Sequence, residues 1–134
     1  MGKLVQYRQV IQKILTEYRD WAAGAKQPDV QECVAFDEDH DHYFWFSVGW
    51  SGKRRDFGVT VYLRIENGKI WVEEDWTKQG IANELLEAGI PPEDIVLGFH
   101  PPQKRPIVHQ SQSAAFYLPG SLEVLYEPVL PGEG

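Results

Sequence analysis

The first pattern along the chain is a stripe of apolar residues spaced three and four positions apart. This spacing places the stripe on one face of a helix of about five turns, and Gly24 followed by Pro28 marks its end. We therefore expect a long N-terminal helix that packs one side against a sheet. The stripe consists of Leu4, Tyr7, Val10, Ile11, Ile14, Leu15, Tyr18 and Trp21.

Runs of β-branched and aromatic residues follow the helix and are separated by polar turns. They predict four strands, over residues 30–36, 42–50, 57–65 and 70–74. The turns between them cover residues 37–41 and 51–56 and the pair Asn67-Gly68, which suits positive φ angles. Successive strands joined by such short turns favour an antiparallel meander.

A short helix over residues 80–88 is expected next, with Asp75 and Thr77 capping its start and Gly89 ending it. Residues 91–94 predict a helical turn and residues 95–99 a short buried strand. From Pro101 onward we expect a loop with one or two edge strands, over 114–118 and 122–126.

Together these elements predict one α+β domain over residues 1–134. Its long N-terminal helix packs on a mainly antiparallel sheet of about five to six strands, with the short helix after the fourth strand. Exposed strand edges and an aromatic-rich sheet make a homo-oligomer a further expectation.

Charge and cysteine content narrow the function classes. The net charge is −7, and six of these seven negative charges fall from Gly68 onward. This disfavours tight nonspecific nucleic-acid binding, which depends on Lys and Arg at phosphates. The single cysteine, Cys33, has no partner for an internal disulfide. The sequence shows neither a signal-peptide pattern nor 18 consecutive apolar residues, so we expect a cytoplasmic protein without membrane contact.

The densest polar cluster is the turn around Asp37, Asp41 and His42, whose side-chain types can hold a divalent metal or relay protons. Adjacent residues on one turn splay apart, so a solvated hairpin turn is the favoured interpretation. A metal-dependent nuclease or hydrolase built on these residues and His100 is the less favoured alternative. The sequence contains no nucleophile elbow, phosphate-binding loop or paired cysteines. We therefore expect no catalytic residue, metal or cofactor.

The one basic run consists of Lys53, Arg54 and Arg55, placed beside Trp50. Such a cluster can contact phosphates, or it can be a solvated turn that discourages edge aggregation, and the second interpretation is favoured.

Several segments of the chain resemble the XisI family, the excision controlling factors named for removal of the fdxN element from cyanobacterial genomes. The likeness spans about residues 3–106. It rests on residues 68–72 (GKIWV), 75–77 (DWT), 80–82 (GIA), 84–85 (EL), 88–91 (AGIP) and 93–102 (EDIVLGFHPP) with Arg105, and on 7–12 (YRQVIQ), 41–43 (DHY) and 48–50 (VGW).

The resemblance implies an accessory protein without enzymatic activity that acts in site-specific DNA excision. Its implied partners are a site-specific recombinase and an XisH-like protein with a nuclease fold, and any DNA contact can be indirect. The alternative is a DNA-binding directionality factor. The chain departs from the family pattern at Tyr62, where a His is expected, and in a divergent tail over 107–134.

No catalytic or ligand residue is carried over from the family. The candidates for partner or DNA binding are Trp50, Lys53, Arg54, Arg55, Asp75, Thr77, His100 and Arg105. Of these, Asp75, His100 and Arg105 are least explained by packing.

Overall fold

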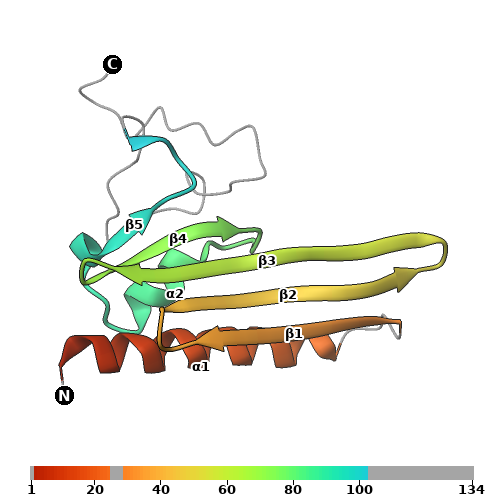
Figure 1. Ribbon diagram of the computed structural model, residues 1–134, viewed down its shortest axis with the longest axis horizontal. Helices are drawn as coiled ribbons and strands as arrows, with labels where there is room; N and C mark the ends of the chain where they lie inside the picture. The colour runs from red at the N-terminus through yellow and green to blue at the C-terminus, as the bar shows by residue number, and fades with distance from the viewer. Residues whose placement is uncertain (1, 25–28, 103–134) are drawn as a thin grey trace.

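The computed structural model describes residues 2–24 and 29–102 (Figure 1). Along the chain come α1 (Lys3–Ala23), β1 (Val30–Asp37), β2 (His42–Ser51), β3 (Arg54–Glu66), β4 (Lys69–Asp75), α2 (Ile81–Glu87), the 3-10 helix η1 (Pro92–Asp94) and β5 (Ile95–Leu97). The predicted α+β class, the long first helix and the short helix after the fourth strand are confirmed. The tail, its expected edge strands and Arg105 lie outside the described residues.

The sheet has five strands in sequence order, and the first four form the predicted antiparallel meander. Asn67 and Gly68 make the tight turn between β3 and β4, with φ angles of 56° and 75°. β5 pairs with β4 in parallel. A parallel neighbour requires a crossover connection, and α2 with η1 supplies it.

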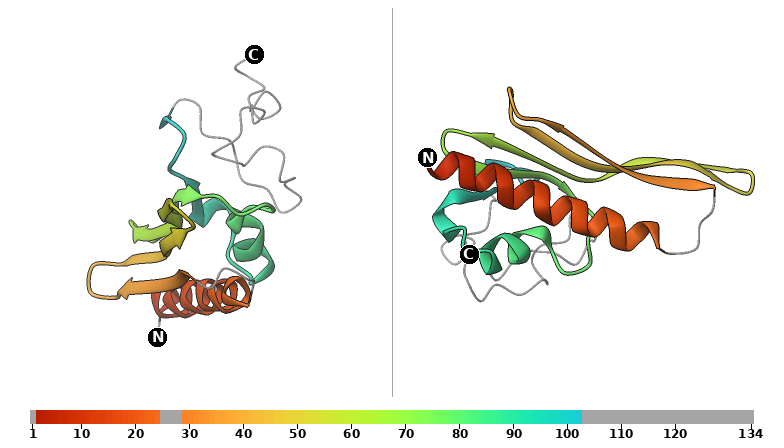
Figure 2. Two further views of the ribbon diagram at one scale, coloured as in Figure 1. Left: turned by 90° about the vertical axis from the view of Figure 1, so that its right-hand side faces the viewer. Right: turned by 90° about the horizontal axis from the view of Figure 1, so that it is seen from below.

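Both helices cover the same face of the sheet (Figure 2). α1 packs on β1 and β2, and α2 contacts α1 and β4. Alternate sheet residues point into this layer. They form the core with one side of α1 and include Tyr43, Trp45, Val61, Leu63, Ile65, Ile70, Val72, Ile95 and Leu97, together with Tyr7, Ile11, Ile14 and Leu15 of α1.

Two sequence expectations about buried and turn residues are wrong. Trp21, placed on the apolar stripe of α1, is 75% exposed, because the last turns of α1 face an open groove instead of sheet side chains. The turn predicted over residues 51–56 is only Gly52 and Lys53. Arg54 pairs with Ser51 and already belongs to β3, because polar residues suit strands that stand clear of the core.

The outer parts of β2 and β3 form a projection that we call the arm, residues 46–59. Figure 1 shows it extending past the end of α1 and past β4. β4 joins β3 only from Val61 inward. Among the described residues, the outer part of β3 therefore pairs with β2 alone.

Candidate functional site

An open groove of about 660 Å³ lies between the last turns of α1, strands β2 and β3, and the loop that joins β4 to α2. We call it the tryptophan groove. Its aromatic lining comes from three separate parts of the chain, namely Tyr18 and Trp21 of α1, Trp45 of β2, and Trp76 of the loop. Trp21 and Trp76 are 75% and 57% exposed. Two large apolar side chains thus remain in contact with solvent at its edges.

The floor of the groove is a packed aromatic pair. The rings of Tyr18 and Trp45 stack with centroids 5.4 Å apart and an angle of 19° between their planes. The Tyr18 hydroxyl donates a hydrogen bond of 3.0 Å to Glu84 of α2. Burial, followed by this hydrogen bond, raises the pKa of Tyr18, so the phenol is neutral and acts as a donor at physiological pH. The bond ties α1 to α2 across the groove.

The loop that carries Trp76 is held by a buried carboxylate. Asp75 has no exposed surface and accepts hydrogen bonds from the Thr77 amide (2.8 Å), the Thr77 hydroxyl (2.6 Å) and the Ile81 amide (2.7 Å). The Thr77 hydroxyl accepts in turn from the Gly80 amide at 3.2 Å. The Trp76 amide donates to the Thr60 carbonyl of β3 at 2.9 Å. Four hydrogen bonds and one sheet contact therefore fix the loop in one conformation.

This network refines the predicted cap. The residue at the N-cap position of α2 is Gly80, with a φ of 91°, and neither Asp75 nor Thr77 stands there. Their side chains nevertheless accept from the first amides of the helix. A φ of 91° is strained for a residue with a side chain, so the N-cap residue offers no side-chain acceptor and the acceptors come from Asp75 and Thr77.

The basic run lies at the tip of the arm, far from the groove. Lys53, Arg54 and Arg55 are exposed, and none is ion-paired within the part of the chain that the structure describes. The guanidinium of Arg55 lies 5.3 Å from the ring centre of Trp50 and 5.6 Å from that of Phe57. These aromatic contacts hold Arg55 in place while leaving its charge uncompensated.

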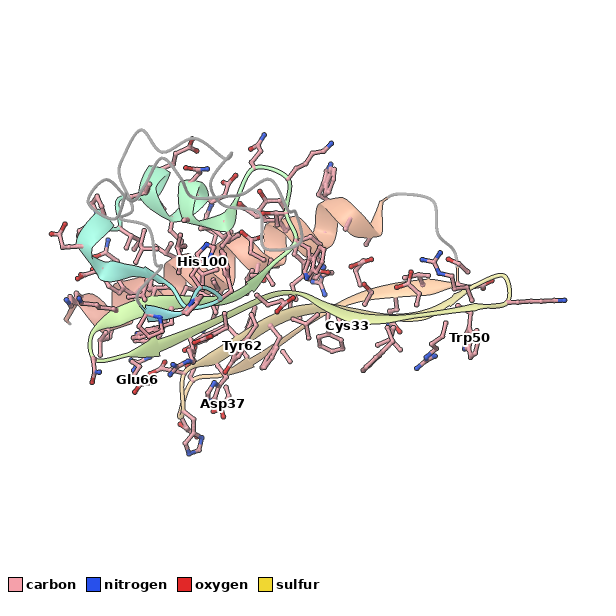
Figure 3. The ribbon with its side chains drawn as sticks, turned by 90° about the horizontal axis from the view of Figure 1, so that it is seen from above. Cys33, Asp37, Trp50, Tyr62, Glu66 and His100 are labelled. Carbon is pink, nitrogen blue, oxygen red and sulfur yellow. The ribbon has the colours of Figure 1, made fainter. Side chains whose placement is uncertain are left out.

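His100 is buried at 6% exposure beside Phe99, with ring centres 4.5 Å apart. Figure 3 shows it near the β5 end of the molecule, at the opposite end from Trp50 on the arm. The structure thus separates the predicted candidates into three places. Asp75 and Thr77 lie at the groove. The basic run and Trp50 lie on the arm, and His100 lies just after β5 in the chain.

The polar turn after β1 is not a single cluster. The Asp37 carboxylate accepts from the backbone amides of Asp39 and His40, while Asp41 binds Arg8 at 2.8 Å and 3.1 Å. The Nδ1 atom of His42 lies 2.8 Å from the Tyr62 hydroxyl on the other face of the sheet. Among residues 2–24 and 29–102, no three His, Cys, Asp or Glu side chains are placed to hold a metal.

The Asp41 carboxylate links the helix α1 to the sheet at the edge of the core. It also accepts from the Tyr43 hydroxyl at 2.7 Å, and the hydrogen bond from Arg8 lowers the pKa of Asp41 despite partial burial. The Asp41 backbone has a φ of 64°, which Asp tolerates better than most residues. The first residue of the DHY segment therefore anchors α1 to the β1–β2 turn.

Sequence reasoning missed the groove. The apolar spacing predicts Trp21 as a buried stripe residue, and Trp76 belongs to the DWT segment that resembles the family. The available signal was weak: Trp76 stands between two polar residues at the end of a strand, where an apolar side chain has no neighbour to cover it.

The fold and the groove together define a small α+β protein with one helix-covered sheet face and an aromatic groove whose loop is fixed by hydrogen bonds. A family model described as "XisI protein" matches residues 1–111. The chain belongs to the XisI family.

Two solved structures from Anabaena variabilis are similar to this chain. An XisI-like protein is 37% identical, with a TM-score of 0.71, over 76% of this chain and 92% of that one. A protein named fdxN element excision controlling factor XisI is 47% identical, with a TM-score of 0.68, over 77% and 98%. A search of curated proteins gave no match. In the described part of the chain, no helix has the length and apolar character needed to span a bilayer.

Proposed function

We propose that this chain is a non-enzymatic accessory protein that controls site-specific DNA excision by holding a protein partner in the tryptophan groove. The observation that carries the proposal is the exposure of Trp21 and Trp76 on a rigid groove in a member of the XisI family. A neighbouring structure bears the name of an fdxN element excision controlling factor. The candidate partners are an XisH-like protein and the site-specific recombinase.

Physical arguments support the groove as the docking surface. Trp and Tyr dominate the binding energy of protein interfaces, above all where they line a preformed pocket. The Asp75 network fixes the loop of Trp76 before any partner arrives, so little conformational entropy is lost on binding.

Co-expression with an XisH-like protein, and separately with the recombinase, tests this proposal. We expect one of them to co-purify with the wild type, and the Trp21→Ala/Trp76→Ala variant to retain the fold and lose the partner. Phe57→Ala is the matched control, because Phe57 is an equally exposed aromatic residue, at 69%, on the arm. Failure of both partners to bind the wild type contradicts the proposal.

A direct DNA contact through the arm is the second candidate function. It is favoured by the uncompensated charges of Lys53, Arg54 and Arg55 at the tip of the arm. There β2 and β3 continue past the last paired residue of β1 as two strands, and a two-stranded ribbon fits the major groove of DNA. Replacing all three by Ala should abolish a gel shift with duplex DNA. It should also flatten the dependence of log K on log salt by about 0.9 for each lost phosphate contact. Replacing Lys13 and Arg19, exposed cations of α1, is the control, and an unchanged shift excludes the arm.

A further inference from the structure

We infer that the tryptophan groove recognises a cationic side chain, arginine or lysine, carried by an exposed segment of its protein partner. The inference rests on the proposed function and names the chemistry of the group that fills the same groove. It follows from the charges that surround the aromatic lining.

Three of the four aromatic residues that line the groove donate a hydrogen bond to a carboxylate. Tyr18 donates to Glu84 at 3.0 Å, the Trp45 indole to Glu32 at 2.8 Å and the Trp76 indole to Glu74 at 2.5 Å. None of these three carboxylates forms an ion pair with a cation of the described residues. Glu84 lines the groove itself, while Glu32 and Glu74 lie beside it, within hydrogen-bond distance of two of its lining indoles. All three carboxylates accept these hydrogen bonds from neutral donors.

Three carboxylates outside the groove, by contrast, have a cationic partner within the chain. Asp41, Glu73 and Asp94 are each paired with an Arg or Lys at 2.7–3.1 Å. The carboxylates of Glu84, Glu32 and Glu74 thus have no such internal partner, and a cation that enters the groove gains electrostatic energy from them without first displacing an ion pair.

The aromatic faces of the groove add a second attraction for a cation. A guanidinium or ammonium over a Trp face is held by the ring quadrupole. Donating an indole N–H to a carboxylate polarises the ring and makes its face more negative, as occurs here for both Trp45 and Trp76. The arm shows the same geometry within the chain, because the guanidinium of Arg55 lies 5.3 Å from the centre of the Trp50 ring.

Two further charged residues line the groove. Glu17 is paired with Lys13 at 2.8 Å, but both side chains are more than 60% exposed. Such a surface pair contributes little and exchanges partners easily. Lys78 is the basic residue of the lining and is exposed. It makes no ion pair with a described residue, so it can turn toward solvent when a cation enters.

The probe for this inference is a capped hexapeptide with two arginines, compared with its counterpart in which citrulline, a neutral isostere, replaces both. Binding is followed by the NMR signals of the Trp21 and Trp76 indole N–H groups in the full chain. We expect the arginine peptide to shift both signals and the citrulline peptide to bind about tenfold more weakly, which corresponds to about 1.4 kcal/mol, within the range of a desolvated cation–π contact. Equal binding of the two peptides overturns the inference.

Charge-removing variants give a second, independent readout. Glu84→Gln keeps an acceptor for the Tyr18 hydroxyl, so it removes charge without disturbing the fold, and it should weaken the arginine peptide by about threefold to tenfold. Glu93→Gln removes one exposed carboxylate from η1, near the opposite end of α1, and should leave binding unchanged. If both variants weaken binding equally, the attraction is only the net charge of the chain, and the inference is wrong.

The same variants separate this inference from the proposed function. A partner that is lost with Trp21→Ala/Trp76→Ala and bound normally by Glu84→Gln supports the docking role and overturns cation recognition. An arginine peptide that binds while neither excision partner does leaves the inference standing and contradicts the proposed function. A wild-type dimer in sedimentation that Trp21→Ala converts to a monomer shows that a second copy fills the groove, which also overturns the inference.

Discussion

Replacing Asp75 by Asn is the sharpest perturbation of the groove, because the two side chains have the same shape. The Asp75 carboxylate accepts from three donors, all at 2.6–2.8 Å, and is fully buried. An Asn oxygen can keep the two bonds from Thr77, but its NH₂ group then faces the Ile81 amide, donor against donor. One charge-assisted hydrogen bond is lost and one buried amide is left unsatisfied, which together should lower the free energy of unfolding by about 2–4 kcal/mol.

The assay is guanidinium denaturation followed by tryptophan fluorescence. The free energy of unfolding in water, and the slope with which it falls with denaturant concentration, are compared between variants. Glu74→Gln is the matched control, because it makes the same change at the preceding residue, whose carboxylate is only half-buried, and should cost less than about 0.5 kcal/mol. A loss for Asp75→Asn as small as that of the control would refute the claim that this carboxylate holds the loop. Partner binding should fall together with stability, since the loop positions Trp76.

Three further outcomes follow from contacts outside the groove. The lowered pKa of Asp41 means that its bond with Arg8 stabilises the fold above the unfolded pKa of about 4, and that this stability is lost as pH falls through the folded pKa. The difference in unfolding free energy between the wild type and Asp41→Asn should therefore shrink between pH 7 and pH 3. A constant difference contradicts this role of Asp41. Gly49→Ala should cost about 1–3 kcal/mol or more in thermal or denaturant unfolding, because its Cβ would lie 2.1 Å from the backbone oxygen of Asp29, just before β1. Gly58→Ala, with nothing within 4 Å, is its control, and similar losses contradict the packing argument. Burial and a hydrogen bond to Asp94 raise the pKa of Tyr7 to about 12. The stability that Tyr7→Phe lacks should therefore be present below pH 10 and lost toward pH 12. A Tyr7 phenol that ionises at pH 10, followed as the absorbance difference between the wild type and Tyr7→Phe, would contradict the shift.

The sequence predicted the elements well where local rules act alone. The stripe on α1 and the Asn67-Gly68 turn depend only on periodicity and on φ preferences. The structure confirms the turn, and it confirms the stripe except at Trp21. The start of β3 at Arg54 could not be predicted, because Lys53, Arg54 and Arg55 have loop-like composition and their strand state comes from pairing with β2.

The groove was beyond sequence reasoning for a related reason. Its aromatic residues lie on α1, β2 and the β4–α2 loop, and no spacing along the chain indicates that they meet. The role of Asp75 was partly predictable, because a carboxylate before a helix suggests a cap. Its three donors, and the displacement of the N-cap to Gly80, depend on the path of the loop.

The continuity of β3 has a consequence for the distance between the two surfaces. Thr60 lines the tryptophan groove and Arg54 stands at the tip of the arm, on one uninterrupted strand. Six residues of extended chain measure about 20 Å. The strand therefore fixes the distance between a partner bound in the groove and a molecule in contact with the tip of the arm. Changing that spacing, by deleting two residues from each side of the β2–β3 hairpin, alters the reach of the molecule without altering either surface.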